Sequence, residues 1–255
     1  MSGRRENDDV LPLHRDPWFT FRFADDRIIP RFHLEGVPPG SHVSVIKINA
    51  ETGERLGLLA TATVGDGGWV DLLQPIAVRA GEGFIAVPML IRHEKERDHE
   101  DVRQVNRLAF GQEAEARLVD ALRAGGHAPV TLVAQIGVQV VGHIMFSDLN
   151  ILAENGTVPA LALAPMAVLP DFQRQGIGSM LVRRGLEVCK EQGHRIVVVL
   201  GHPDFYPRFG FLAKLAESLE SPFGSGPSHL AVELMPGALD GVAGRLAYSP
   251  PFSQL

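Results

Sequence analysis

The sequence predicts a domain of mixed α and β structure, of the α+β (α/β) class, preceded by a small antiparallel β-sandwich. Residues 18–87 hold seven short strand-like runs separated by glycine- and proline-rich turns, with no helical window among them. Beyond Pro88, strand patterns alternate with amphipathic helical patterns. A strand, a glycine-rich loop and a helix then follow one another between Ala164 and Gly178. These observations divide the chain into two domains.

Composition limits the class of protein. The chain has 255 residues, of which 45% are hydrophobic and 21% charged, as in ordinary globular proteins. Its net charge of -6 argues against a nucleic-acid binder whose affinity depends on neutralising phosphates. The first residues lack the apolar core of a signal peptide, and no run of 18 apolar residues occurs. We therefore expect a cytoplasmic protein without a membrane span. The single cysteine, Cys189, is expected to be a buried thiol.

The first domain is predicted at residues 18–87, after a charged, aperiodic segment 1–17 that we expect to be a flexible tail. Phe19, Phe21 and Phe23 alternate with polar residues, which is typical of a half-buried strand. Nothing in this domain resembles a catalytic constellation, so substrate presentation, oligomerisation and partner binding all remain open as its role. Further strands are expected at Ile29–Val37, His42–Asn49, Leu56–Val64, Trp69–Leu73, Ile76–Val78 and Phe84–Val87.

The second domain is predicted at residues 88–255. Its first strand is expected at Leu90 to Arg92, and the helical patterns that follow place Val102 and Val105 on one face, then Leu118 and Leu122 on another. The helices, the hairpin and the strands that follow are expected at Asp98–Ala109, Glu113–Ala124, Thr131–Phe146, Ala160–Val168, Ser179–Gly193, Ile196–Leu200 and Leu230–Leu234.

The glycine loop suits a phosphorylated ligand, because exposed backbone N–H groups at a helix N-terminus attract anions. A Walker-type loop needs Gly-Lys-Ser/Thr, whereas Gly178 is followed by Ser179 and Met180. A dinucleotide fingerprint needs a third glycine, but position 181 is leucine. The ten histidines have no cysteine partners and form no His-Glu-x-x-His pair, so no metal is expected.

The hexapeptide from Gln173 to Gly178 matches the Gln/Arg-x-x-Gly-x-Gly/Ala loop of the GNAT superfamily of acyl-CoA-dependent N-acetyltransferases. Tyr206, four residues before Gly210-Phe211, matches a second landmark of that superfamily. The resemblance covers residues 90–255 and looks closest to the YhbS-like subgroup. It implies a mixed central sheet with two splayed strands, flanked by helices, and an acyltransferase that uses acetyl-CoA as co-substrate.

The resemblance also implies the roles of individual residues. The strand end Met166, Ala167 and Val168 would pair with the pantetheine arm, and the Val168 N–H would polarise the thioester carbonyl. Tyr206 would protonate the departing CoA thiolate as a general acid. Backbone amides would hold the pyrophosphate at Gln173, Arg174, Gln175, Gly176, Ile177, Gly178 and Ser179, with Arg174 able to add a charge-assisted contact.

One departure concerns the end of the buried strand, where many family members carry an asparagine. This chain has Val199-Leu-Gly-His-Pro203 instead, which puts the side-chain contacts to the pantetheine in doubt. The general base is not readable from the sequence: His143, Asp148, Glu154 and His202 are all candidates, and His202 has the best sequence argument because it lies four residues before Tyr206.

The acceptor is expected to be a primary amine of a small molecule or a protein, attacked directly, and neither its identity nor a preference for a longer acyl chain can be read. A homodimer is left open. The alternative from another class is a catalytically weak acyl-CoA-binding scaffold or regulatory protein, with the β-domain as its partner module.

Overall fold

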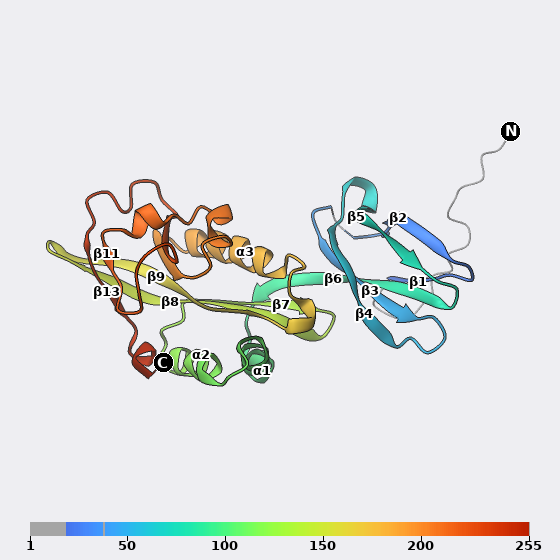
Figure 1. Ribbon diagram of the computed structural model, residues 1–255, viewed down its shortest axis with the longest axis horizontal. Helices are drawn as coiled ribbons and strands as arrows, with labels where there is room; N and C mark the ends of the chain where they lie inside the picture. Colours follow the sequence, from blue (N-terminus) through green and yellow to red (C-terminus); the bar gives the residue numbers. More distant parts are fainter. Residues whose placement is uncertain (1–18, 38, 255) are drawn as a thin grey trace. The chain divides into compact units, whose positions relative to one another are not determined.

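The computed structural model describes residues 19–37 and 39–254, so the segment expected to be a tail lies outside the described residues. The chain forms two compact units, coloured along the sequence in Figure 1. The first runs to Leu90 and includes Gln135–Gln139, and the second comprises Ile91–Ala134 and the residues from Val140 onward.

The first unit is an antiparallel β-sandwich. One sheet has the order β4-β3-β6-β1, and the other pairs β2 with β5. Phe32 and Val70 of the small sheet share one apolar core with Val45 and Phe84 of the larger sheet, which confirms the sandwich predicted from the strand spacing. The strands are β1 Phe19–Arg22, β2 Arg27–His33, β3 His42–Asn49, β4 Arg55–Thr63, β5 Trp69–Val78 and β6 Glu82–His93.

Two boundaries differ from the sequence expectation. The runs predicted at Trp69–Leu73 and Ile76–Val78 form one strand, β5, whose pairing with β2 shifts register opposite Pro30. Proline has no N–H to donate to the ladder, so the break in pairing falls there. The strand predicted at Leu90 to Arg92 is the end of β6, and Val87 and Pro88 lie within that strand rather than in a linker.

The second unit is built on a mixed sheet with the strand order β12-β10-β9-β8-β7. Helices α1 and α2 lie on one face of this sheet and α3 on the other (Figure 1). The elements are α1 His99–Phe110, α2 Ala114–Ala124, β7 Val130–Ile136, β8 Gln139–Ala153, β9 Gly156–Val168, α3 Ile177–Glu191, β10 Ile196–Leu200, β11 Leu219–Glu220, β12 His229–Glu233 and β13 Gly244–Tyr248, with short 3₁₀ turns between several of them.

Packing on the two faces follows the helical periodicities. On the α1/α2 face, Val102 and Leu118 pack in one core with Met145, Ala162 and Val198 of the sheet. On the other face α3 approaches β8 closely at Gly185, where a Cβ would lie 2.4 Å from Phe146 Cε2. That glycine therefore sets the distance between helix and sheet. Cys189 of α3 is buried, as expected for a structural thiol.

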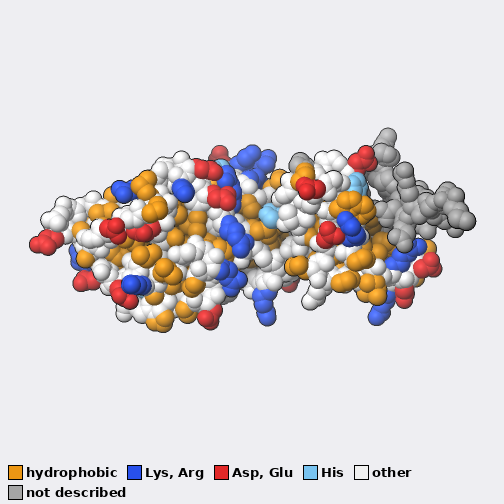
Figure 2. Space-filling view, turned by 90° about the horizontal axis from the view of Figure 1, so that it is seen from above, with side chains coloured by type: hydrophobic (Ala, Val, Ile, Leu, Met, Phe, Trp, Pro, Cys, Tyr) orange, Lys and Arg blue, Asp and Glu red, His pale blue; other side chains and the backbone are white. Residues whose placement is uncertain are grey.

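Strands β11 and β13 were not predicted. β13 pairs antiparallel with the outer part of β8, and β11 pairs with β13. On the face shown in Figure 2, acidic and basic side chains are interspersed over both units. Within the described ranges, no helix combines the length and apolar character that a membrane crossing requires.

Candidate acyl-CoA site

Strands β9 and β10 separate toward their carboxyl ends. β9 pairs with β8 from Gly156 to Val168, with a bulge between Leu163 and Met166, but its parallel register with β10 covers only Leu161↔Val197 and Ala162↔Val198. We call the region from Leu163 to Val168 of β9, opposite Val199–Leu200 of β10, the β9–β10 splay. The splayed strands expected from the sequence are thus confirmed.

The alternation of peptide groups shows which residues face the splay. The Leu169 N–H donates to the Val141 carbonyl of β8 at 2.9 Å. Because successive residues turn their peptide groups to opposite sides, those of Val168 and Met166 point away from β8 and those of Ala167 point toward it. The Val168 carbonyl accepts a hydrogen bond from Gln173 Nε2 at 3.0 Å. Met166 and Val168 therefore have N–H groups directed into the splay.

The loop after β9 presents further backbone donors. Gly176 has φ +85°, a left-handed conformation that glycine adopts without a steric penalty, and Arg174 is also left-handed at φ 60°. The first helical bond of α3 runs from the Met180 N–H to the Gly176 carbonyl at 3.0 Å. The N–H groups of the first turn, from Ile177 to Ser179, consequently have no acceptor within the helix. No acidic side chain lies in that turn, so it suits an anion.

Tyr206 begins a 3₁₀ turn, η4 (Tyr206–Phe209), that lies close to the strand end and the loop. A Cβ on Gly178 would lie 3.5 Å from Met166 Cε and 3.7 Å from Phe205 Cζ. Three segments that the motif analysis singled out, the strand end, the loop and the tyrosine turn, therefore meet around Gly178.

Gly201 follows β10, in the segment that departs from the family pattern. A Cβ at this position would lie 2.2 Å from Tyr206 Cε2, so the tyrosine ring rests directly against the glycine backbone. The ring is also held edge-on by Phe205 and Phe211, at centroid distances of 5.0 Å and 5.5 Å. Any side chain at position 201 would displace the ring.

The Tyr206 hydroxyl keeps its proton at neutral pH. The residue is 7% exposed, and burial raises the pKa of its phenol to about 12. It is therefore protonated at neutral pH. Among residues 19–37 and 39–254, this hydroxyl makes no hydrogen bond. It therefore does not fix a neighbouring loop within the described part of the chain.

His143, one candidate base, lies in a buried polar cluster beneath α1. Asn106 Nδ2 donates to the Val102 carbonyl at 2.9 Å and contacts His143 Nδ1 at 3.2 Å. Both amide hydrogens are thus used, which makes Nδ1 the acceptor and leaves the proton on Nε2. His143 Nε2 lies 3.6 Å from Glu94 Oε2, within ion-pair range but too long for a hydrogen bond. The imidazole is fully buried and directed toward this carboxylate.

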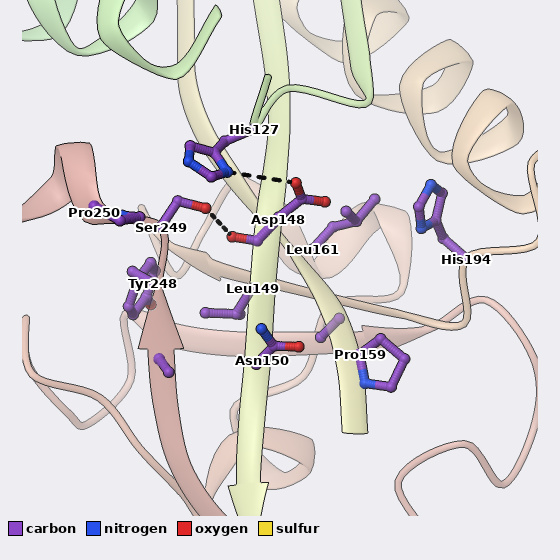
Figure 3. Close-up of a pocket in the computed structure, with 12 residues that line it drawn as sticks. His127, Asp148, Leu149, Asn150, Pro159, Leu161, His194, Tyr248, Ser249 and Pro250 are labelled. Atoms are coloured by element: carbon purple, nitrogen blue, oxygen red, sulfur yellow. Dashed lines mark hydrogen bonds and ion pairs between the residues drawn. The ribbon is translucent and has the colours of Figure 1, made fainter. Parts of the chain in front are cut away.

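Asp148 and Glu154 lie away from Tyr206. Asp148 lines a pocket of about 410 Å³ with His127 and His194, near the C-terminal end of α3 (Figure 3). The 15 residues of α3 place that end roughly 22 Å from the glycine loop. Glu154 lies in the turn of the β8–β9 hairpin, just before Gly156, which is 12 residues or roughly 40 Å along β9 from Val168. The structure brings neither carboxylate to the splay.

His202 does lie near Tyr206. It is exposed, and its carbonyl accepts the N–H groups of Phe205 at 3.0 Å and Tyr206 at 3.3 Å. Sequence reasoning missed another histidine, His229, which lies opposite Leu200 in the β10–β12 register. A lone polar residue at the start of an apolar strand was the available signal. In the part of the chain that the structure describes, no group of three or more His, Cys, Asp or Glu side chains is arranged to hold a metal.

Comparison with known proteins agrees with this geometry. The profile of the acetyltransferase (GNAT) domain matches residues 90–213. The uncharacterised N-acetyltransferase YhbS of Escherichia coli K12 is 34% identical over 168 residues, which cover 65% of this chain and 99% of YhbS. YjhQ of the same strain, also an uncharacterised N-acetyltransferase, is 39% identical over 116 residues; the match covers 45% of this chain and 64% of YjhQ, slightly under two thirds of that relative.

Two solved structures resemble the second unit. The YhbS crystal structure in complex with CoA aligns with a TM-score of 0.61 and 32% identity, covering 66% of this chain and 93% of YhbS. A GNAT family acetyltransferase from Brucella melitensis in complex with acetyl-CoA aligns with a TM-score of 0.55 and 34% identity, covering 64% and 97%. The chain therefore belongs to the GNAT family of acetyltransferases, and it is an acyltransferase. Within that family it is YhbS-like.

Proposed function

We propose that the protein transfers the acetyl group of acetyl-CoA to a primary amine by direct attack. The observation that carries this proposal is the convergence of three features at one place: β9 N–H groups directed into the splay, the open N-terminus of α3, and a protonated tyrosine hydroxyl with no hydrogen-bond partner among the described residues. The binding of CoA and acetyl-CoA by the two similar structures supports the choice of co-substrate.

The pyrophosphate would bind the backbone amides from Gln173 to Ser179, with Arg174 adding charge from the exposed side of the loop. The pantetheine arm would extend along the splay and pair with the peptide groups of Met166 and Val168. Since Ala167 directs its peptide groups to β8, it would support this edge rather than bind the arm.

The contacts of Gly178 favour one position for the thioester. A Cβ on Gly178 would meet both Met166 and Phe205, the residue before Tyr206, so the tyrosine turn lies beside Met166. We therefore place the thioester carbonyl at the Met166 N–H, which would stabilise the developing oxyanion, and assign the Val168 N–H to the pantetheine arm.

In the reaction, the amine nitrogen bonds to the carbonyl carbon and loses a proton to a base. The carbon–sulfur bond then breaks, and the thiolate takes the proton of the Tyr206 hydroxyl. Products are the acetylated amine and free CoA.

Thiol release from acetyl-CoA, measured with a panel of amines, tests this function. We expect turnover by the wild-type protein, and a Tyr206→Phe variant with kcat lowered about 10²-fold or more while KM for acetyl-CoA changes little. Equal kcat in the two proteins would remove Tyr206 from the mechanism. Tight CoA binding without turnover on any amine would favour the scaffold alternative.

A further inference from the structure

His229 lies beside the point at which β10 leaves β9. It is the first residue of β12 and is paired with Leu200, the last residue of β10. The next residue, Gly201, donates its N–H to the Ser228 carbonyl at 2.9 Å. The chain around His229 is thus held directly against the segment on which the Tyr206 ring rests.

The His229 side chain points to the face opposite Tyr206. The missing Cβ of Gly201 is directed at the Tyr206 ring. Side chains alternate along a strand, so Leu200 and its partner His229 point to the other face, the one covered by α1 and α2. Ala231, two residues further along β12, confirms this direction because it packs in the α1/α2 core. Leu200 is 46% exposed, which leaves that face accessible at the splay.

The His229 imidazole is buried, and one of its nitrogens is unpaired among the described residues. His229 is only 4% exposed, yet its Nε2 has no hydrogen-bond partner among the described residues. A buried polar atom without a partner costs about 1–3 kcal/mol, so such atoms are rare unless they serve a ligand, a water or a reaction. Its backbone is fixed by a hydrogen bond from the His229 N–H to the Gly226 carbonyl at 3.0 Å.

Few charges surround this imidazole. The strand β10 carries no titratable side chain, and the turn Ala213–Ala216 carries only the exposed Lys214. Glu233, on the same face of β12, accepts the N–H groups of Gly237 and Leu239. The segments that connect β10, this turn and β12 also carry Tyr206, which lies on the opposite face, and the exposed residues His202, Asp204, Arg208, Glu217 and Glu220. Burial lowers the pKa of His229, so its imidazole is neutral at pH 7.

From this placement we propose that His229 is the general base that takes the proton of the acceptor amine, directly or through one water. The assignment rests on the acetyl transfer proposed above. The amine approaches from the α1/α2 face, its nitrogen bonds to the carbonyl carbon, and its proton passes to His229 Nε2. The carbon–sulfur electron pair goes to sulfur, which is protonated by Tyr206 from the opposite face. Acid and base thus flank the thioester on the two sides of the sheet.

The test measures thiol release from acetyl-CoA with spermidine, tryptamine, kanamycin and a peptide with a free N-terminus, across a range of pH. For every amine that reacts, kcat/KM of the wild-type enzyme should rise through one common pKa below 6.5 that belongs to the enzyme. His229→Gln should lower kcat/KM about 10²-fold at pH 7 and abolish this common step, with KM for acetyl-CoA unchanged. Added imidazole should restore part of the activity of His229→Ala.

His194→Gln is the matched control, because it removes an imidazole near the far end of α3 and should retain wild-type kinetics. Unchanged kinetics in His229→Gln, or loss of the common step in His202→Gln instead, would overturn the assignment while leaving acetyl transfer intact. A folded His229→Ala protein that loses activity without imidazole rescue would indicate a structural role and also overturn it. Absence of thiol release by the wild-type enzyme would overturn both proposals.

Discussion

Two histidines flank the β9–β10 splay on the same face of the sheet, and they differ in what surrounds them. His143 of β8 lies opposite Ala167, beside Asn106 and the Glu94 carboxylate. His229 of β12 lies opposite Leu200, and its Nε2 has no partner among the described residues. Burial of an imidazole is common to both. Neither Nε2 has a hydrogen-bond partner among the described residues, but His143 Nε2 faces the Glu94 carboxylate within ion-pair range, whereas no ion pair joins a described residue to His229 Nε2. The difference teaches that a nearby carboxylate and amide make His143 part of the scaffold, whereas His229 has no charged partner that would hold its proton.

The largest effect should come from displacing Tyr206, the proposed acid on the face of the sheet opposite His229. Gly201→Ala places a methyl group where the Tyr206 ring lies, so the ring must move. Because a displacement of about 1 Å can cost 10²-fold in rate, we expect kcat to fall by about that factor. A crystal structure of the variant should show the shifted ring, and wild-type kcat would contradict the proposed position of the acid. Gly126→Ala, a left-handed position with no neighbour near its Cβ and away from the splay, is the control for backbone strain alone.

The structural role of His143 can be tested by changing Glu94, the carboxylate that it faces. Arg123 Nη2 lies 2.5 Å from Glu94 Oε1, and the Glu94 side chain is 3% exposed. Burial opposes ionisation of Glu94, but the His143 imidazole and the Arg123 charge outweigh it and lower the pKa of the carboxyl. Breaking such a buried pair costs about 3–5 kcal/mol. Glu94→Gln should therefore lower the free energy of unfolding by about that amount, as measured by urea denaturation.

The kcat of Glu94→Gln can be compared with that of His229→Gln. The folded fraction should retain wild-type kcat, unlike His229→Gln. A stable Glu94→Gln protein with reduced kcat would instead indicate that the Glu94–His143 cluster takes part in catalysis.

A substitution in the glycine loop should have a smaller effect, on KM for acetyl-CoA. Gly176 has φ +85° at the start of α3, a conformation that costs other residues about 1–2 kcal/mol. Gly176→Ala should distort the loop and raise KM for acetyl-CoA about 5- to 20-fold, with little change in kcat. Gly193→Ala carries the same backbone conformation at the other end of α3 and should leave KM unchanged. Equal KM in both variants would argue against the loop as the pyrophosphate site.

The mildest effect concerns pH and stability. Burial lowers the pKa of His143 and of His229 in the folded protein from a usual value of 6.5. A depressed folded pKa means that the unfolded chain binds the proton more readily. Stability should therefore be complete above pH 6.5 and decline as the pH falls below it. Melting temperatures should show this decline in the wild type and a weaker one in His229→Gln; an unchanged slope would mean that His229 is not buried in its neutral form.

The sequence was informative where function depends on local spacing. The glycine loop could be predicted because Gly176 and Gly178 lie at fixed intervals after Gln173. Tyr206 could be predicted because it lies four residues before the Gly210-Phe211 pair. The β-sandwich followed from alternation and turn residues. These features need no knowledge of distant contacts.

The remaining features depend on pairing between distant segments. β13 exists because Gly244–Tyr248 pairs with β8, some ninety residues earlier, and its own pattern is not distinctive. The continuity of β6 through Pro88 was hidden by a residue that usually ends strands. The relation of His229 to Tyr206 arises from the β10–β12 register and the absent side chain of Gly201, neither of which local sequence reveals.

A crystal structure with bound CoA tests the central claim most directly. The account predicts the pyrophosphate on the amides from Gln173 to Ser179, the pantetheine arm along the unpaired edge of β9, and the sulfur within hydrogen-bond reach of the Tyr206 hydroxyl. A CoA molecule bound elsewhere, or a sulfur out of reach of that hydroxyl, would contradict it.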